Sequence, residues 1–499
     1  MMKNSTYKII TIIVSIYLIM ATLICSACNK DFLEQKPQGI LTEETFLNSE
    51  KDALLATNAI YNAMGDWNFF SGGFPILDML SDDAEKGSNP EDAVELLTIT
   101  NFTFNSSYVG FYRWYSSLYK TIRRANIVID KVPEIAMDEN LKNRLIAEAR
   151  LIRALCYFDL VKAFGDVPKI TTSTPPLKIS RSSKIEIYND IIIDDLKFAI
   201  NHLPVKSSYT NKDIGRVTLG AARALLAKVY LYLNDFENTE KYVMDIITSG
   251  QYNLEPDFTN VFSSKNIHGI ESIFELGAID EMNRSLGGIQ YGATQGVRGT
   301  PNKGWGFNRP SWNLINFFEK DDIRKDATII FLGEVIDSIL IIGDEDTPDI
   351  TYTDETETEI KEIETYNQKV WVKGNTTQDQ WGYNIHVIRY AEILLIAAEV
   401  LNENNKPSEA LIYLNMIRRR ADLTEISEQN IDLLRPLIWK ERRAELALER
   451  DRFFDLIRQG RAGQVLGPLG FIEGKHELLP IPQIEIDLSE GNFTQNPGY

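Results

Sequence analysis

The stretch TLGAARALLAKVYLYLNDFENTEKYVMDIITSG, residues 218–250, decides the fold. Thr218 is the expected N-cap of a first helix that reaches about Leu233. Asp235 is the expected N-cap of a second helix, which ends at Gly250. Together the two helices occupy roughly the 34 residues of a tetratricopeptide repeat. Because such a helix hairpin buries its apolar face only by stacking on other helices, the stretch predicts a larger helical array.

Helical patterns continue on both sides of this hairpin. Apolar residues recur three and four positions apart, and Ser, Gly and Pro mark the expected helix ends. The expected helices run from Ser49 to Gly65, from Phe111 to Ile129, from Leu141 to Leu160, from Ser183 to Pro204, from Ile385 to Asn402 and from Ser408 to Arg420. The last two form a second hairpin of similar size. We therefore predict a mainly α fold, a tetratricopeptide-like helical array.

The charge balance limits the classes of partner. The chain has 499 residues, with 52 Lys and Arg against 71 Asp and Glu, and a net charge of −19. Binding of nucleic acids depends on clustered Lys and Arg side chains that neutralise phosphates. We therefore expect no nucleic acid partner. The length suggests about three domains, but one helical array with a loop-rich insert accounts for it better.

The first 27 residues differ from the rest of the chain. Lys3 and Lys8 precede an almost wholly apolar run, residues 9–24. This run is slightly long for a signal-peptide core and slightly short for a membrane span. Two small residues then lead to Cys28, as in a bacterial lipobox, although Cys25 stands where Leu is usual. We expect cleavage before Cys28 and its acylation with a lipid such as palmitate; an uncleaved signal anchor is the alternative.

Only one unmodified cysteine is expected in the mature chain. If Cys25 leaves with the signal peptide and Cys28 carries the lipid, only Cys156 remains and no disulfide forms within the chain. Cys156 lies in a helical pattern, and no histidine lies nearby in the sequence to activate it. We expect it to be a small buried apolar residue.

A glycine-rich region interrupts the helices. Seven glycines fall within residues 287–306, among aromatic and arginine side chains. Glycine lets the backbone approach a ligand, and aromatic faces suit the C–H face of a sugar ring whose rim needs polar partners. A second aromatic and acidic cluster follows the first long helix. The candidate ligand-binding residues are Tyr291, Arg298, Trp305, Arg309 and Trp312 in the first region and Trp67 and Asp83 in the second. Alternatively, these aromatics plug the edge of the core.

Motifs for catalysis, cofactors and metals are not evident. The four histidines are dispersed, the glycine-rich region lacks the P-loop lysine, and no Gly-x-Ser-x-Gly elbow occurs. The acidic stretch from Asp344 to Glu355 lacks the spacing of a calcium loop, so we expect a solvated loop there. We therefore expect no enzyme activity, no cofactor and no metal site.

A charged segment lies near the C-terminus. Between Glu441 and Arg458, acidic and basic residues alternate around Leu446 and Leu448. On one helix, opposite charges three and four residues apart can form salt bridges. We expect a structural lattice that joins this helix to its neighbours, rather than a catalytic cluster.

Short motifs over the whole chain resemble those of the SusD/RagB family of Bacteroidetes outer-membrane lipoproteins. In chain order they are Asp31-Phe32-Leu33, Arg153-Ala154, Tyr157-Phe158, Phe164-Gly165-Asp166-Val167-Pro168, Gly215-Arg216, Glu271-Ser272-Ile273-Phe274-Glu275, Arg389-Tyr390-Ala391-Glu392, Leu414-Asn415, Glu441-Arg442-Arg443-Ala444-Glu445-Leu446, Arg452-Phe453-Phe454-Asp455-Leu456, Leu479-Pro480-Ile481-Pro482 and Gln495-Asn496-Pro497-Gly498-Tyr499. Each motif is short, but their shared order over the whole chain argues against chance similarity.

The resemblance implies a function as well as a fold. Members of this family are non-enzymatic lipoproteins of the outer membrane that capture oligosaccharides, or peptides in RagB-like members, for a SusC-like TonB-dependent transporter. A scaffolding protein without a small-molecule ligand is the alternative from another class. The acidic chain favours a neutral glycan, unless Arg298 and Arg309 create a local positive pocket.

We expect the following organisation, with the three last segments packed into one globular unit. It comprises a signal peptide at 1–27, a lipidated tether at 28–41, an N-terminal helical array at 42–270, a loop-rich insert and candidate ligand-binding region at 271–384, and a C-terminal helix hairpin and tail at 385–499.

Overall fold

The computed structural model describes most of the chain in two separate units. The described residues are 3–26, 47–210, 212–277, 290–344, 350–353, 359–362, 364–372 and 382–499. The first unit, residues 1–48, contains helix α1 (Lys3–Ser26), and the second unit is residues 49–499. Over the described part of the chain, no helix combines the length and apolarity needed to cross a membrane. The expected lipidation site, Cys28, and the expected tether, residues 28–41, lie outside the described residues.

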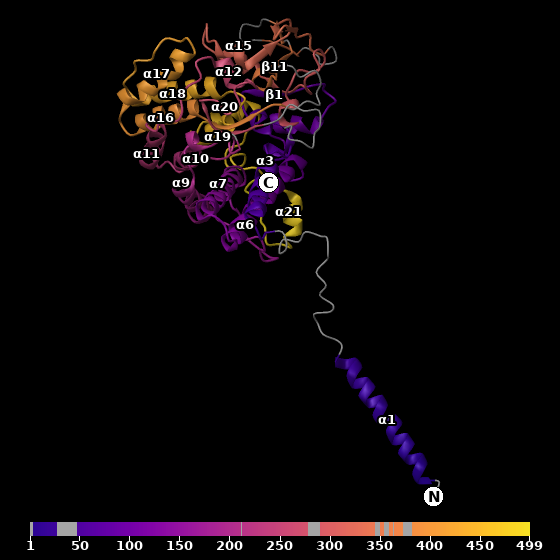
Figure 1. The fold of residues 1–499 in the computed structure, drawn as a ribbon. Coiled ribbons are helices and arrows are strands. Elements are labelled where there is room, and N and C mark those ends of the chain that lie inside the picture. Colours follow the sequence, from indigo (N-terminus) through magenta and orange to yellow (C-terminus); the bar gives the residue numbers. More distant parts are fainter. Residues whose placement is uncertain are drawn as a thin grey trace. The chain divides into compact units, whose positions relative to one another are not determined.

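The second unit is built on a helical array. Its helices pack in chain order, each against the next, and Figure 1 shows α6, α7, α9, α10, α11, α16 and α17 following one another along one side. Their bounds are α3 (Glu50–Met64), α6 (Val109–Lys131), α7 (Glu139–Phe164), α9 (Asp194–His202), α10 (Leu219–Tyr232), α11 (Phe236–Ile247), α16 (Tyr390–Glu403), α17 (Pro407–Arg420) and α18 (Ile431–Leu446). The mainly α prediction is confirmed.

The hairpin α10–α11 has the predicted caps. Thr218 Oγ1 accepts a hydrogen bond from Ala221 N at 3.3 Å, and Asp235 Oδ1 accepts one from Asn238 N at 3.1 Å. Each side chain thereby satisfies a backbone N–H that has no partner within its helix. The described array also buries the thiol of Cys156 in α7, as expected.

Two of the predicted helices were wrong in part. Residues 385–389 form strand β12 (Ile385–Arg389), which pairs with β4 (Ser272–Leu276), so α16 begins only at Tyr390. The β-branched residues Ile385, Val387 and Ile388 favour the extended conformation of β12. The segment from Glu441 to Arg458 is also two helices rather than one. Helix α18 ends at Leu446, α19 (Arg452–Arg458) follows, and between them Leu448 and Arg450 adopt positive φ angles of 62° and 74°.

The remaining elements are short. Described strands pair only as two-stranded antiparallel ribbons. Their bounds are β1 (Ala84–Gly87) with β5 (Phe307–Pro310), β2 (Val167–Pro168) with β3 (Arg181–Ser182), β6 (Ile329–Phe331) with β11 (Thr365–Asn367), β7 (Val335–Ile336) with β8 (Ile339–Leu340) and β9 (Ile350–Thr353) with β10 (Glu359–Glu362). Short helices include α4 (Ile76–Met79), α5 (Leu97–Thr100), α12 (Phe258–Val261), α13 (Gln290–Ala293), α14 (Trp312–Phe317), α15 (Arg324–Thr328), α20 (Ala462–Leu466) and α21 (Gln483–Leu488).

The expected charge lattice is present and buried. Glu445 lies at its centre, where Arg389 Nη1 approaches Glu445 Oε1 to 2.5 Å and Arg324 Nη1 approaches Glu445 Oε2 to 3.2 Å. Burial alone would raise the pKa of Glu445, but Arg420, Arg389 and Arg324 outweigh it and hold that pKa well below its usual range. The turn after α18 also brings Glu449 Oε2 to 2.8 Å from Arg389 Nε.

The lattice ties the start of the array to its end. Arg443 Nε donates to Asp83 Oδ1 at 2.7 Å, and Arg452 Nε donates to Asp82 Oδ1 at 2.8 Å. All four side chains are buried. An apolar cluster follows the same path, because Ala84, Leu314 and Ile329 share one core with Ala444 and Leu448. Segments from the beginning, middle and end of the second unit therefore form one interior.

Candidate functional site

The glycine loop, residues 290–306, begins with α13, folds back on itself and leads into β5. Its returning half donates backbone hydrogen bonds to its outgoing half. These run from Trp305 N to Ala293 O (2.9 Å), from Gly306 N to Gly296 O (3.0 Å) and from Gly304 N to Val297 O (2.9 Å). Because the backbone bonds close the loop internally, its shape is set before any ligand arrives.

Two glycines allow the halves to come this close. A Cβ on Gly304 would lie 2.5 Å from Gly296 Cα and 2.5 Å from Ala293 O, and a Cβ on Gly296 would lie 2.6 Å from Lys303 O. No side chain fits in either position without moving the backbone. At these two positions, glycine therefore allows the close approach of backbone to backbone. Gly304 also lines the cavity described below, so the expected approach of backbone to a ligand stays a prediction.

Asn308 anchors the loop to the interior. Its amide Nδ2 donates to Gln295 Oε1 at 2.8 Å and to Asp78 Oδ2 at 3.2 Å. Asp78 in turn accepts a hydrogen bond from Arg450 N at 2.9 Å. Asp78 is fully buried, and burial raises the pKa of its carboxyl to about 7. The loop that carries Trp305 is thus fixed at both ends by buried polar groups.

Two tryptophans from distant segments meet beside this loop. The ring of Trp305 lies 5.9 Å from that of Trp67, with their planes at 85°, and Phe74 lies 5.6 Å from Trp67. Phe307 completes the group at 4.9 Å from Phe74. Trp67, Phe74 and Trp305 are half-buried. These four side chains form an aromatic cluster with rings in edge contact, the arrangement that aromatic pairs favour.

A cavity of about 550 Å³ adjoins the cluster, and we call it the Trp305 cavity. It is lined by Asp92, Arg298, Gly299, Asn302, Gly304, Trp305, Phe307 and Asp344. The lining combines two aromatic rings with an amide and with charged groups. Pockets of this size hold small molecules, and this combination suits a ring with an apolar face and a polar rim.

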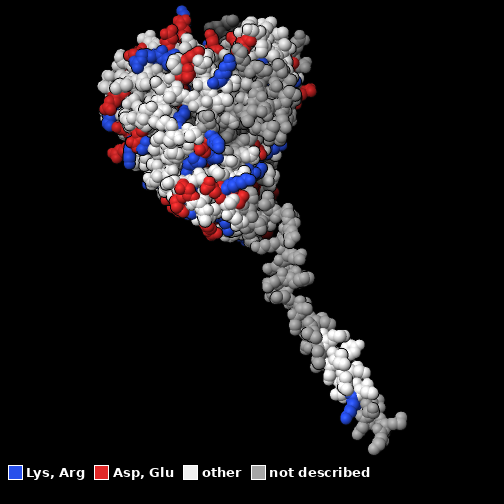
Figure 2. All heavy atoms as spheres, in the orientation of Figure 1, with Lys and Arg blue, Asp and Glu red and all other residues white. Residues whose placement is uncertain are grey.

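The arginines of the candidate site are neutralised. Arg298 forms ion pairs with Asp92 and, at 2.5 Å from Nε, with Asp344. Arg309 pairs with Glu85 across the ribbon β1–β5. On the face shown in Figure 2, basic and acidic side chains are also interspersed over the described residues. The local positive pocket left open by the sequence is therefore not supported by the geometry of Arg298 and Arg309.

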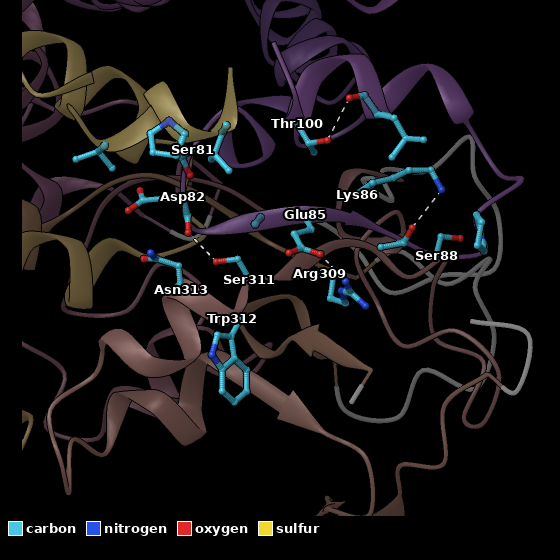
Figure 3. A pocket seen from close by; sticks show the side chains of 17 residues that line it. Ser81, Asp82, Glu85, Lys86, Ser88, Thr100, Arg309, Ser311, Trp312 and Asn313 are labelled. Atoms are coloured by element: carbon cyan, nitrogen blue, oxygen red, sulfur yellow. Dashed lines mark hydrogen bonds and ion pairs between the residues drawn. The ribbon is translucent and has the colours of Figure 1, made fainter. Parts of the chain in front are cut away.

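A second cavity of about 610 Å³ lies along β1, and we call it the Trp312 cavity. Figure 3 shows Asp82 and Asn313 toward one end, Lys86 and Ser88 toward the other, and Glu85 with Arg309 between them. Trp312 begins α14, where Ser311 Oγ caps the helix by accepting from Leu314 N at 3.1 Å. The indole of Trp312 also packs against the apolar core cluster. Trp312 therefore fits in part the alternative prediction that these aromatics fill the edge of the core.

The structure divides the predicted site residues into three groups. Arg298 and Trp305 line the Trp305 cavity, and Trp67 contacts the ring of Trp305 without lining the cavity. Arg309 and Trp312 line the second cavity. Tyr291 and Asp83 are buried, with exposed fractions of 2% and 0%. Tyr291 packs on Phe70, and Asp83 belongs to the charge lattice, so neither is open to a ligand.

Sequence reasoning missed several lining residues. Phe307 had an available signal, because it is an aromatic residue two positions after Trp305. The same holds for Phe74, which contacts Trp67 in the aromatic cluster but lines neither cavity. Asn302 lies between Arg298 and Trp305 in the glycine-rich region, so its position in the sequence was also a signal. Asp92 and Asp344 had none, because only the fold brings the loop after β1 and the segment around Asp344 to Arg298.

Comparisons with known proteins agree with this fold. A model of the SusD family matches residues 270–499, and a model described as "Starch-binding associating with outer membrane" matches residues 31–231. The SusD-like protein P2 of Formosa agariphila is 29% identical, over 94% of this chain and 96% of its own. A SusD-like protein of Bacteroides ovatus is 27% identical, over 88% of this chain and 81% of its own.

Solved structures extend the likeness to three dimensions. A laminarin binding SusD-like protein superposes with a TM-score of 0.75 and 27% identity, covering 91% of this chain and 100% of its own. Surface glycan-binding protein A from Bacteroides thetaiotaomicron, in complex with laminarihexaose, superposes with a TM-score of 0.75 and 25% identity, covering 90% and 100%. With two family models over most of its length and relatives that match it from end to end, the chain belongs to the SusD/RagB family.

Proposed function

We propose that this protein binds neutral glycans at the cell surface and delivers them to a SusC-like TonB-dependent transporter in the outer membrane. The observation that carries the proposal is the aromatic cluster of Trp67, Phe74, Trp305 and Phe307 beside the Trp305 cavity. Stacking of a sugar ring on an indole buries its C–H face, while Asn302 and the paired charges offer polar partners for hydroxyl groups.

The relatives support a glycan as the ligand. Solved structures of similar fold are named for laminarin, laminarihexaose and surface glycan binding. The ion pairs of Arg298 and Arg309 support a neutral rather than an acidic glycan, because an anionic sugar would meet carboxylates on both sides of Arg298. The net charge of −19 also disfavours an acidic glycan, because it repels anionic sugars over longer distances.

The proposed location is the outer membrane. The model that matches residues 31–231 describes proteins associating with the outer membrane. We propose that cleavage before Cys28 and acylation of that residue anchor the protein there, facing the extracellular side. The acidic chain is then held by its lipid and by the transporter, since its charge opposes close contact with an anionic surface.

The test is binding by the protein without its expected signal peptide and lipid. We would express the chain from residue 29 onward without its lipid and screen it on a glycan array that includes laminarin, followed by titration calorimetry. We expect saturable binding to at least one neutral glycan and weaker binding to uronic acid polymers. Binding to peptides but not glycans would favour a RagB-like peptide carrier. Binding to neither, with an intact transporter complex, would favour a scaffold, and release of sugar products would favour a hydrolase.

A further inference from the structure

The two cavities share a thin wall. Ser88 lines the Trp312 cavity, whereas Arg298 and Asp92 line the Trp305 cavity. Arg298 Nη1 donates to Ser88 Oγ at 2.7 Å, and Ser88 Oγ donates to Asp92 Oδ2 at 3.2 Å. At this point a side chain that lines one cavity is hydrogen-bonded to side chains that line the other. We call this wall the ridge, residues 88–92.

The ridge is held firmly from both sides. Ser88 N donates to Gly306 O of the glycine loop at 2.8 Å. Lys86, on the side of the Trp312 cavity, donates from Nζ to Asn89 O at 2.7 Å. The same ammonium group lies 5.6 Å from the ring centre of Phe307, which lines the other cavity. The relative placement of the two cavities is therefore fixed by bonds within the fold.

The Trp312 cavity has the mixed lining that a neutral sugar chain needs. Its apolar lining residues include Leu97, Val465, Pro468 and Leu469. Its polar lining residues include Asn313 and the Glu85–Arg309 pair. Figure 3 places Ser88 at the end of this cavity beyond Glu85 and Arg309, which is the end that adjoins the ridge.

We propose that the two cavities form one extended site, in which a linear neutral oligosaccharide crosses the ridge and places sugar units in both. This inference rests on the proposed function and adds a preference for chain length. Each cavity has the volume of a pocket for a small molecule, about 550 and 610 Å³, so each holds only a short part of a polysaccharide. A short oligosaccharide fills the Trp305 cavity alone, and a longer one gains the second set of contacts without a second loss of translational freedom.

The experiment measures affinity against chain length. Calorimetry would use neutral laminari-, cello- and malto-oligosaccharides of two to eight units, with the protein from residue 29 onward. The informative variants are Leu469→Glu and Leu97→Glu, which place a carboxylate in the Trp312 cavity. Both leucines are more than two fifths exposed, so their replacement leaves the core intact. Leu177→Glu is the matched control, because Leu177 is exposed and lines neither cavity.

We expect the wild-type protein and L177E to gain at least tenfold in affinity between the shortest oligosaccharide that binds and the longest. In L469E and L97E this gain disappears, while affinity for the shortest binder stays unchanged. Affinity that does not grow with length in the wild-type protein, or a gain that survives in both cavity variants, overturns the inference and leaves the proposed function standing. Failure of every oligosaccharide and polysaccharide to bind overturns both.

Discussion

The indole of Trp67 meets the indole of Trp305 edge to face, with ring centroids 5.9 Å apart. Trp67 follows the first helix of the array, and its ring lies against Gly73, where a Cβ would approach Trp67 Cε2 to 2.9 Å. Trp305 comes from the glycine loop. Each ring therefore limits the movement of the other, and the orientation of the surface they present is set by two segments that lie far apart in the sequence.

Replacing Trp305 tests this surface. We expect Trp305→Ala to weaken binding of the best glycan from the array by about 1–3 kcal/mol, because it removes one stacking anchor. Trp439→Ala is the control, since Trp439 lies on α18 and lines neither cavity. Calorimetry on both variants checks the prediction. Affinity equal to that of the wild-type protein in Trp305→Ala would remove Trp305 from the site. In a double-mutant cycle, we expect Trp67→Ala and Trp305→Ala to be non-additive, because the two rings touch.

The charge of the Trp305 cavity gives a second prediction. We expect Asp92→Asn to raise affinity for a uronic acid oligosaccharide by about 0.5–1 kcal/mol, because it leaves Arg298 with one carboxylate partner fewer. Affinity for a neutral oligosaccharide should change less, and the gain should shrink at high salt. Asp66→Asn, which alters an exposed ion pair with Lys120, is the control. Equal changes for charged and neutral ligands would contradict this account of selectivity.

The glycine loop gives a third prediction. We expect Gly304→Ala to lower glycan affinity severely, because the added Cβ would lie 2.5 Å from Gly296 Cα and must displace the backbone beneath Trp305. The midpoint of urea unfolding should change little if the loop alone rearranges. Gly467→Ala has open space around its Cβ and serves as the control with unchanged affinity. Normal binding by Gly304→Ala would show that the loop does not depend on this contact.

The buried charge lattice gives a prediction about stability. We expect Arg389→Gln to lower the free energy of unfolding by about 3–5 kcal/mol, since Glu271, Glu445 and Glu449 would lose their shared buried partner. Arg419→Gln breaks an exposed pair with Glu425 and should cost about 0–1 kcal/mol. Urea denaturation of both variants checks the difference. A similar decrease in the free energy of unfolding for both variants would mean that the buried ion pairs stabilise the fold no more than an exposed pair does.

Asp78 predicts how stability depends on pH. Its pKa is about 7 in the folded protein and 3.8 in its ordinary state. Between these values the folded state keeps a proton that the unfolded state has lost, so this group's contribution lowers the free energy of unfolding as the pH rises. We expect the wild-type protein to lose more stability than Asp78→Asn between about pH 5 and about pH 7.5. Parallel pH profiles for the two proteins would exclude this role for Asp78.

The array was predictable from the sequence because its signals are local. The cap residues Thr218 and Asp235 and the apolar spacing that indicate α10 and α11 all lie within the segment that forms these two helices. The errors occur where tertiary contacts override such patterns. Residues 385–389 pair with β4, and the turn after Leu446 allows Glu449 to reach Arg389. Neither partner lies nearby in the sequence.

The candidate site was predictable only in part. Tryptophans within a glycine-rich segment indicated its position, and Trp305 does line a cavity there. Composition could not distinguish Tyr291, which is buried beneath Arg450, from Trp305, because both are aromatics in the same segment. It also could not reveal that Asp92 and Asp344 flank Arg298, since the fold alone brings these three together.

The pairing of Asp82 and Asp83 with Arg443 and Arg452 affects how the chain can be made. Synthesis proceeds from the N-terminus, so the two carboxylates are available long before their arginines. A product that stops short of Arg443 would have to bury two adjacent acidic groups without partners, at a cost of several kcal/mol. Incomplete chains are therefore left unable to close their interior and remain open to proteolysis. These ion pairs therefore make the stability of the folded state depend on a chain that includes both Arg443 and Arg452.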